Sequence, residues 1–214
     1  MFGIRIRIEY DGFGVNLRPF CKADLPNLVE HFDSMKVHMF TKGLFAQTLE
    51  NEEEWYERNR NDQTTCVWAI VPDGSDVVVG TTGLHDTKNI HGSCYSGIII
   101  WDDSLWGKGI ATRAHLGRTR FAAGFLNRTT IKSAARVNNE ASVRALARVG
   151  YNKIGVEPRT TTRDGEYLDT QLFTWLHPGK IGLLFPEGLP EVYEEGVALA
   201  KIALGKARQV VSFP

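Results

Sequence analysis

The chain has 214 residues, 43% of them hydrophobic and 23% charged, which suits one globular domain and excludes disorder throughout. Its 25 basic and 25 acidic residues cancel, so no global field draws the protein toward nucleic acid or an anionic membrane. Three cysteines without Cys-x-x-Cys spacing favour a reducing compartment, and no apolar run approaches the roughly 20 residues that span a bilayer. We therefore expect a soluble, cytoplasmic protein without a bound metal that binds neither nucleic acid nor membranes.

Strands and helices are predicted to alternate along most of the chain. Strands, marked by period-two alternation or β-branched runs between turn signals, are predicted at 4–9, 15–20, 64–71, 76–84, 95–101, 129–137, 151–156 and 166–176. Helices, marked by caps and apolar spacing, are predicted at 24–32, 44–60, 109–125, 140–149 and 189–210. Because turn-rich residues 11–14 and 72–75 separate the first two and the next two strands, each pair should form an antiparallel hairpin.

The last part of the chain predicts an appended element. Residues 177–188 carry two prolines and three glycines, as expected of a linker, and the helix at 189–210 follows. We therefore divide the chain into a domain at 1–177 and an extension at 178–214. The apolar face of the last helix predicts packing on its own domain or on a second subunit, which would make the protein a homodimer.

A short turn between a predicted buried strand and a helix carries the clearest chemical signal. It reads Trp106-Gly107-Lys108-Gly109-Ile110-Ala111-Thr112. Two glycines let the backbone turn sharply, so that the free amides of the first helical turn point at one spot, which suits a phosphate. The spacing matches neither Gly-x-Gly-x-x-Gly nor a Walker loop. Taken alone, the turn fits tight strand-to-helix packing equally well.

Further motifs surround this turn in a fixed order. They are Leu17-Arg18-Pro19 with Asp24, Gly83-Leu84-His85-Asp86, the Asn139-x-x-Ser142 helix start, Gly150-Tyr151, and the segment from Asp164 to Asp169. Together they resemble the GNAT superfamily of N-acetyltransferases over about residues 15–177, with most similarity to the ribosomal-protein and spermidine acetyltransferase branch. The resemblance implies a mixed α/β fold with a strongly twisted mixed sheet, splayed central strands and flanking helices. In this chain a C-terminal helical extension is added.

The resemblance also implies acetyl-CoA as the cosubstrate, lying between strands 95–101 and 129–137. Ile99 and Trp101 would offer backbone groups to pantetheine, and Asn139 with Ser142 would border the thiol arm. Amides of the turn would hold the pyrophosphate; these belong to Gly107, Lys108, Gly109, Ile110, Ala111 and Thr112. Trp106 stands where the family usually has Gln or Arg. Arginines that could meet the 3′-phosphate, or simply face solvent, are Arg113, Arg118, Arg120, Arg144 and Arg148.

The implied activity is direct transfer of an acetyl group to a primary amine. Many relatives place an acidic tyrosine seven residues after the motif asparagine, but that position is Leu146 here. Ser142 is the candidate acid or thiolate hydrogen-bond donor, with helix capping as its alternative role. Tyr95 occupies the place of the usual glutamate base, and His85, with its loop neighbours Asp86 and His91, is the fallback.

The sequence does not determine which amine accepts the acetyl group or whether the protein catalyses the transfer efficiently. A protein N-terminus, a polyamine or another small amine such as an aminoglycoside or an amino acid would fit the implied activity. The departures at the proton-transfer positions also allow an acyl-CoA-binding module with little turnover. A third alternative is an interaction protein built on the C-terminal helix.

Overall fold

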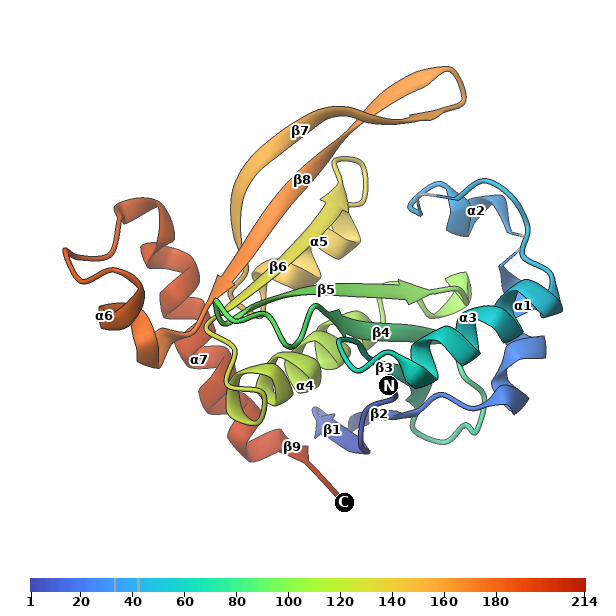
Figure 1. Ribbon diagram of the computed structural model, residues 1–214, viewed down its shortest axis with the longest axis horizontal. Helices are drawn as coiled ribbons and strands as arrows, with labels where there is room; N and C mark the ends of the chain where they lie inside the picture. The colour runs from blue at the N-terminus through green and yellow to red at the C-terminus, as the bar shows by residue number, and fades with distance from the viewer. Residues whose placement is uncertain (33, 42) are drawn as a thin grey trace.

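A nine-stranded mixed sheet forms the centre of the computed structural model, which describes residues 1–32, 34–41 and 43–214 (Figure 1). The strands are β1 (Ile6–Tyr10), β2 (Phe13–Pro19), β3 (Cys66–Pro72), β4 (Gly80–His85), β5 (Ser93–Ile100), β6 (Thr130–Arg136), β7 (Asn152–Arg163), β8 (Glu166–Leu176) and β9 (Val211–Ser212). Their order across the sheet is β7-β8-β6-β5-β4-β3-β2-β1-β9. Every neighbouring pair is antiparallel except β5 and β6, which run parallel.

Helices cover both faces of the sheet. They are α1 (Leu25–His31), α2 (Met35–His38), α3 (Leu49–Asn61), α4 (Ile110–Gly124), α5 (Glu140–Ala147), α6 (Ile181–Leu184) and α7 (Glu194–Val210). Successive side chains of a strand point to opposite faces, so Trp68 of β3 enters the main core with α4, α5 and α7. The next residue, Ala69, enters a second core with α1 and α3. The expected mixed α/β fold is therefore confirmed.

Most predicted elements occur, with shifted ends. The two predicted hairpins are present as the antiparallel pairs β1–β2 and β3–β4. The helix predicted from Leu44 begins instead at Leu49, because the Thr48 side chain accepts a hydrogen bond from Asn51 N (3.3 Å) and caps it there. The strand predicted to end at Val156 continues to Arg163, since β7 and β8 form one long, curved hairpin.

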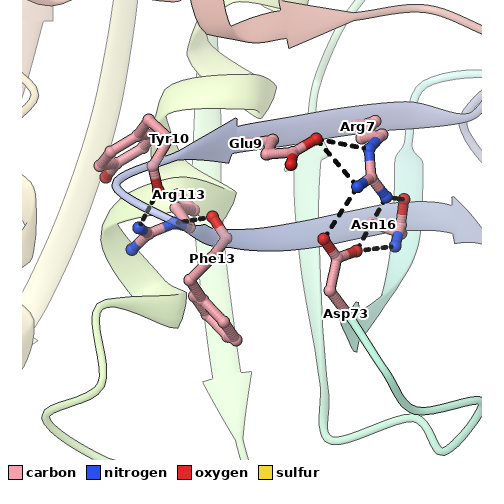
Figure 2. A network of polar contacts seen from close by, with 7 residues as sticks. All are labelled: Arg7, Glu9, Tyr10, Phe13, Asn16, Asp73 and Arg113. Atoms are coloured by element: carbon pink, nitrogen blue, oxygen red, sulfur yellow. Dashed lines mark hydrogen bonds and ion pairs between the residues drawn. The ribbon is translucent and has the colours of Figure 1, made fainter.

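The start of α4 is fastened to the N-terminal hairpin (Figure 2). Arg113 of α4 donates to the carbonyl groups of Tyr10 (2.8 Å) and Phe13 (3.2 Å), on either side of the β1–β2 turn. Elsewhere on the hairpin, the Arg7 guanidinium pairs with Asp73 (2.8 Å) in the loop after β3. The Arg113 contacts fix the position of the helix start that follows residues 106–109.

The helix α7 packs deeply into the main core. It contributes Ala200, Ala203 and Ala207, and it lies against the turn that follows α5. Gly150 in that turn has φ +89°, and a Cβ atom there would lie 2.3 Å from Ala200 N. Glycine is therefore required twice at this position, for its backbone conformation and for the close approach of α7.

Candidate active site

The parallel strands β5 and β6 separate soon after they meet. Only three residue pairs join them, from Ser93–Thr130 to Tyr95–Lys132. One step further, Ser133 Oγ donates to the Ser96 carbonyl (3.2 Å). Beyond this point a cleft of about 490 Å³ opens between the two strands. The expected splay of the central strands is present.

One edge of β5 is used entirely by β4. Trp101 N donates to Val79 O (3.0 Å), and Ile99 pairs with Thr81. The Ile99 carbonyl oxygen lies so close to Gly80 that a Cβ atom there would be 2.3 Å away from it. The backbone groups of Ile99 and Trp101, which we expected to face pantetheine, are therefore directed at β4.

The other edge of β5 faces the cleft. Since successive peptide groups of a strand point to alternate neighbours, the groups that border the cleft belong to Ile98 and Ile100. The Trp106 indole confirms this direction, because its Nε1 donates to Ile100 O (2.9 Å). Apart from Ile100 O, which accepts this bond, the backbone groups of the β5 edge have no strand partner here in the described part of the chain, so the edge suits an extended amide-containing ligand.

Residues 106–112 form the end of the cleft where α4 begins. Gly107 and Gly109 have φ values of +79° and +81°, the left-handed conformation that glycine adopts most easily. The first helical hydrogen bond runs from Arg113 N to Gly109 O (3.2 Å), so the amides of residues 110–112 precede the hydrogen-bonded part of the helix. Positive φ, free amides and the helix dipole together make this turn fit a phosphate group.

The opposite wall of the cleft is the start of α5. The Asn139 side chain caps this helix by accepting a hydrogen bond from Ser142 N (3.1 Å). Capping thus uses the Asn139 side chain and the Ser142 backbone, and it does not require the Ser142 hydroxyl. Both residues line the cleft.

The five candidate arginines fall into two groups. Arg113 holds the β1–β2 hairpin, Arg118 is fully buried beneath the sheet, and Arg120 donates to backbone carbonyls at the end of α7. Arg144 and Arg148 line the cleft, and Arg144 is ion-paired within its own helix at 2.8 Å. Arg148 is consequently the candidate best placed to meet a phosphate of a bound nucleotide.

Arg118 supports the strand at the point where β5 leaves β6. Its Nη1 donates to Thr82 Oγ1 (2.6 Å) and to the Gly97 carbonyl (2.7 Å). Its Nη2 donates to His115 Nδ1 (2.7 Å). Burial, and then the charge of Arg118, lowers the pKa of His115 well below its usual value, so this ring is neutral and can accept the bond.

His85 and Tyr95 face each other across β4 and β5. Their neighbours Leu84 and Cys94 are in the main core, so the two side chains lie on the face opposite α4. Neither lines the cleft in the described part of the chain. The His85 residue is exposed, but its ring leans over Gly83, and this partial burial, followed by the charge of Arg118, lowers its pKa. Tyr95 is half exposed.

A segment that the sequence did not predict covers the cleft. The cleft is lined here by Val37 of α2 and by Phe40 and Thr41, which follow that helix. Lys36 pairs with Asp103 at 2.6 Å, and the Phe40 ring lies edge-on to Trp106 with centroids 5.8 Å apart. We call residues 34–41 the strap. Its helix has four residues, too few to leave a periodic pattern.

Two further arginines could not be singled out from the sequence; one lines the cleft and the other contacts the strap. Arg163, near the tip of the β7–β8 hairpin, donates to the carbonyls of His38 (3.1 Å) and Thr41 (2.7 Å), and so ties the hairpin to the strap. Arg136, at the end of β6, lines the cleft and donates to hydroxyl groups of the same hairpin. Their partners are distant in sequence, so no local motif marks either residue.

Metal-binding clusters and membrane-spanning helices are both absent from the described part of the chain. No group of three or more His, Cys, Asp or Glu side chains among these residues could hold a metal ion. No helix in residues 1–32, 34–41 and 43–214 is long and apolar enough to cross a membrane.

This combination of a splayed parallel strand pair and an amide-rich turn is that of an acetyltransferase fold. Residues 15–152 match the family described as "Acetyltransferase (GNAT) domain". The chain therefore belongs to the GNAT acetyltransferase family, as the resemblance in the sequence indicated. No curated protein matches the sequence.

Solved structures share this fold at low sequence identity. A spermidine N-acetyltransferase from Vibrio cholerae, in complex with CoA and spermine, has a TM-score of 0.69 and 20% identity over 76% of this chain and 95% of that one. A protein assigned as a ribosomal-protein-serine acetyltransferase from Vibrio cholerae gives 0.64 and 17%, over 79% and 97%. A protein assigned as an acetyltransferase from T. thermophilus gives 0.64 and 22%, over 96% and 99%.

Proposed function

We propose that this protein transfers an acetyl group from acetyl-CoA directly to a primary amine. The observation that carries the proposal is the cleft itself, in which the free edge of β5 leads to the amide-rich turn at residues 106–112. A pantetheine arm has the length and amide groups to pair with such an edge, while a pyrophosphate would meet the turn. The CoA complex of the spermidine acetyltransferase of this fold supports the choice of cosubstrate.

Individual residues receive roles from their positions. The amides of Gly107 and of residues 109–112 would hold the pyrophosphate. The Lys108 amide, which we also expected there, donates instead to Leu105 O (3.4 Å). The backbone groups of Ile98 and the amide of Ile100, not the groups of Ile99 and Trp101, would pair with pantetheine, since the Ile100 carbonyl already accepts from Trp106. Asn139 and Ser142 would border the thiol arm.

The chemistry requires a neutral amine and a proton for the departing thiolate. His85 does not line the described cleft, so it is our candidate for a base that accepts the ammonium proton through intervening water; its lowered pKa favours the neutral ring. Tyr95, its partner across the strands, would orient the amine or the ring. The Ser142 hydroxyl, which the helix cap does not need, would donate to the thiolate.

Thiol release from acetyl-CoA, measured with a panel of primary amines, tests this proposal. Release that depends on the amine, with the acetylated amine identified by mass spectrometry, is the expected result. Ser142→Ala should lower kcat about tenfold and leave the dissociation constant of acetyl-CoA unchanged. Ser104→Ala, at an exposed serine of a short 3-10 helix (Asp103–Leu105), is the matched control.

The alternative is a module that binds acyl-CoA without efficient turnover. Acetyl-CoA binding by calorimetry, together with no thiol release for any amine, would favour that alternative and exclude the transferase. If acetyl-CoA does not bind and no thiol is released, the assignment of the cleft as the acetyl-CoA site is wrong as well.

A further inference from the structure

We propose that the acceptor amine carries a carboxylate, and that Arg136 binds this carboxylate inside the cleft. The proposal rests on the transferase activity proposed above and narrows its substrate class. The observation behind it is that Arg136, like Arg148, lines the cleft and forms no ion pair in the described part of the chain. Arg136 lies on the wall away from residues 106–112.

Arg136 is directed at the acceptor side of the sheet. The preceding residue of β6, Ala135, is packed in the main core with α4 and α5. Because consecutive residues of a strand alternate between faces, the Arg136 side chain lies on the opposite face, beside the β7–β8 hairpin. It is 7% exposed, and the cleft is the space that it borders.

The guanidinium group has one edge engaged and one edge available. Its Nη1 donates to Thr160 Oγ1 (2.7 Å) and to Thr170 Oγ1 (2.8 Å). Arginine has five N–H donors, and within residues 1–32, 34–41 and 43–214 neither Nε nor Nη2 has a hydrogen-bond partner. These two nitrogens form the side-on fork that matches the two oxygens of a carboxylate.

Charge favours an anion at the same place. Arg163 is also buried, at 6% exposed, and among the described residues it donates to backbone carbonyls alone. Burial, and then the nearby charge of Arg163, lowers the pKa of Arg136. Neither arginine forms an ion pair in the described part of the chain; Glu157, opposite Thr170 in the register, is exposed. Two buried like charges are costly without an anion, and a carboxylate would offset that cost.

The same arrangement disfavours a polycation. Glu140 is the acidic residue that borders the cleft in the described part of the chain, and it is already paired with Arg144 at 2.8 Å. A polyamine would therefore meet the Arg136 guanidinium group and find no unpaired carboxylate in the described lining of the cleft. The substrate class would then differ from that named for the spermidine acetyltransferase of the same fold.

Matched pairs of amines, differing only in the carboxylate, test the proposal. We would measure kcat/KM for glycine, β-alanine and γ-aminobutyrate against glycinamide, β-alaninamide and γ-aminobutyramide, with L-amino acids and their amides as a second series. Replacing the acid by its amide also changes the pKa of the amine. We therefore divide the acid-to-amide ratio of kcat/KM in wild type by the same ratio in Arg136→Met. We expect this quotient to be at least tenfold for the preferred chain length.

Further variants separate recognition from folding. Arg136→Lys keeps the charge without the fork, and it should retain part of the preference. Arg159→Met, on the exposed side of the same hairpin, should retain all of it. Melting temperatures identify any variant that fails to fold, and in that event the lysine variant carries the test.

The outcomes distinguish this inference from the proposed function. Acetylation of amines with an unchanged acid-to-amide ratio in Arg136→Met overturns the carboxylate site and leaves the transferase intact. Selection of spermidine over every acid overturns it likewise. Selection of O-phosphoethanolamine over ethanolamine, lost in Arg136→Met, would assign the fork to a phosphate and exclude the carboxylate. Absence of transfer to all amines overturns both proposals.

Discussion

The two ends of the cleft are built in opposite ways. The turn at residues 106–112 is one continuous segment, and it offers backbone amides whose direction follows from two glycines and a helix start. The acceptor wall is assembled from the strap, the end of β6 and the β7–β8 hairpin, joined by side chains such as Arg163, which reaches His38 across 125 positions. The first end therefore suits a constant ligand recognised through the backbone, while the second suits a variable ligand recognised through side chains.

The largest effect is expected at the turn, from Gly109→Trp. A Cβ atom at Gly109 would lie 2.8 Å from Arg113 Nη1, and the left-handed φ of +81° would strain any residue other than glycine, so the turn would lose the backbone geometry that suits a phosphate. Loss of about three charge-assisted hydrogen bonds, each about 1.5 kcal/mol, corresponds to roughly a thousandfold rise in the dissociation constant of acetyl-CoA. Isothermal titration calorimetry measures this change.

Gly12→Trp is the matched control for that variant. Gly12 has φ +69° and lies in the β1–β2 turn with open space around it, so its substitution adds similar strain away from the cleft. Equal affinities in the two variants would show that the turn does not hold the pyrophosphate.

An intermediate effect is expected on the acceptor side, from His85→Gln. A base acts only when neutral, so kcat/KM falls as the pH drops through its pKa. Since the pKa of His85 is lowered from 6.5, the acid limb of wild type should lie below that value. The variant should lose this limb and about a hundredfold in kcat/KM at pH 7, measured by thiol release.

His91→Gln serves as the control, because His91 is an exposed histidine in the loop that follows β4. Its pH profile should match wild type. A normal acid limb in His85→Gln, or its loss in His91→Gln, would move the base to another residue.

The smallest effect is expected from Arg148→Met. If Arg148 meets the 3′-phosphate, one exposed charge contact is lost, and the dissociation constant of acetyl-CoA should rise about fivefold to tenfold. Wild type and variant should bind 3′-dephospho-CoA equally. Calorimetry with both ligands checks this, and equal losses for both ligands would place Arg148 elsewhere on the cofactor.

Sequence reasoning succeeded where the determinant was local. The glycines of the turn and the cap at Asn139 act within a few residues of themselves, so their order in the chain was enough to find them. The choice between Ile99 and Ile98 was different, because the direction of each peptide group depends on the pairing of Trp101 with Val79. That register is a property of two strands and is not visible in either one alone.

The acceptor side of the cleft could not be predicted from the sequence, because it too depends on contacts between distant segments of the chain. The strap is held by an ion pair, an aromatic contact and Arg163, and its own helix is too short to show periodicity. In the sequence, Arg136 looks like an exposed arginine at the end of a strand. Its burial becomes apparent from its hydrogen bonds to two threonines of the β7–β8 hairpin. Long-range side-chain contacts of this kind leave no pattern in a single sequence.

The closing contacts of α7 and β9 have a consequence for how the protein is made. Val211 of β9 pairs with Ile8 of β1, and Ala200, Ala203 and Ala207 of α7 complete the main core. The sheet and the core therefore contain segments from both ends of the chain. While the chain is being synthesised, the edge of β1 and the apolar surface beneath α4 stay uncovered until α7 has left the ribosome. The sheet and the main core can therefore be completed only after α7 and β9 have been translated, later than the segments that form the cleft.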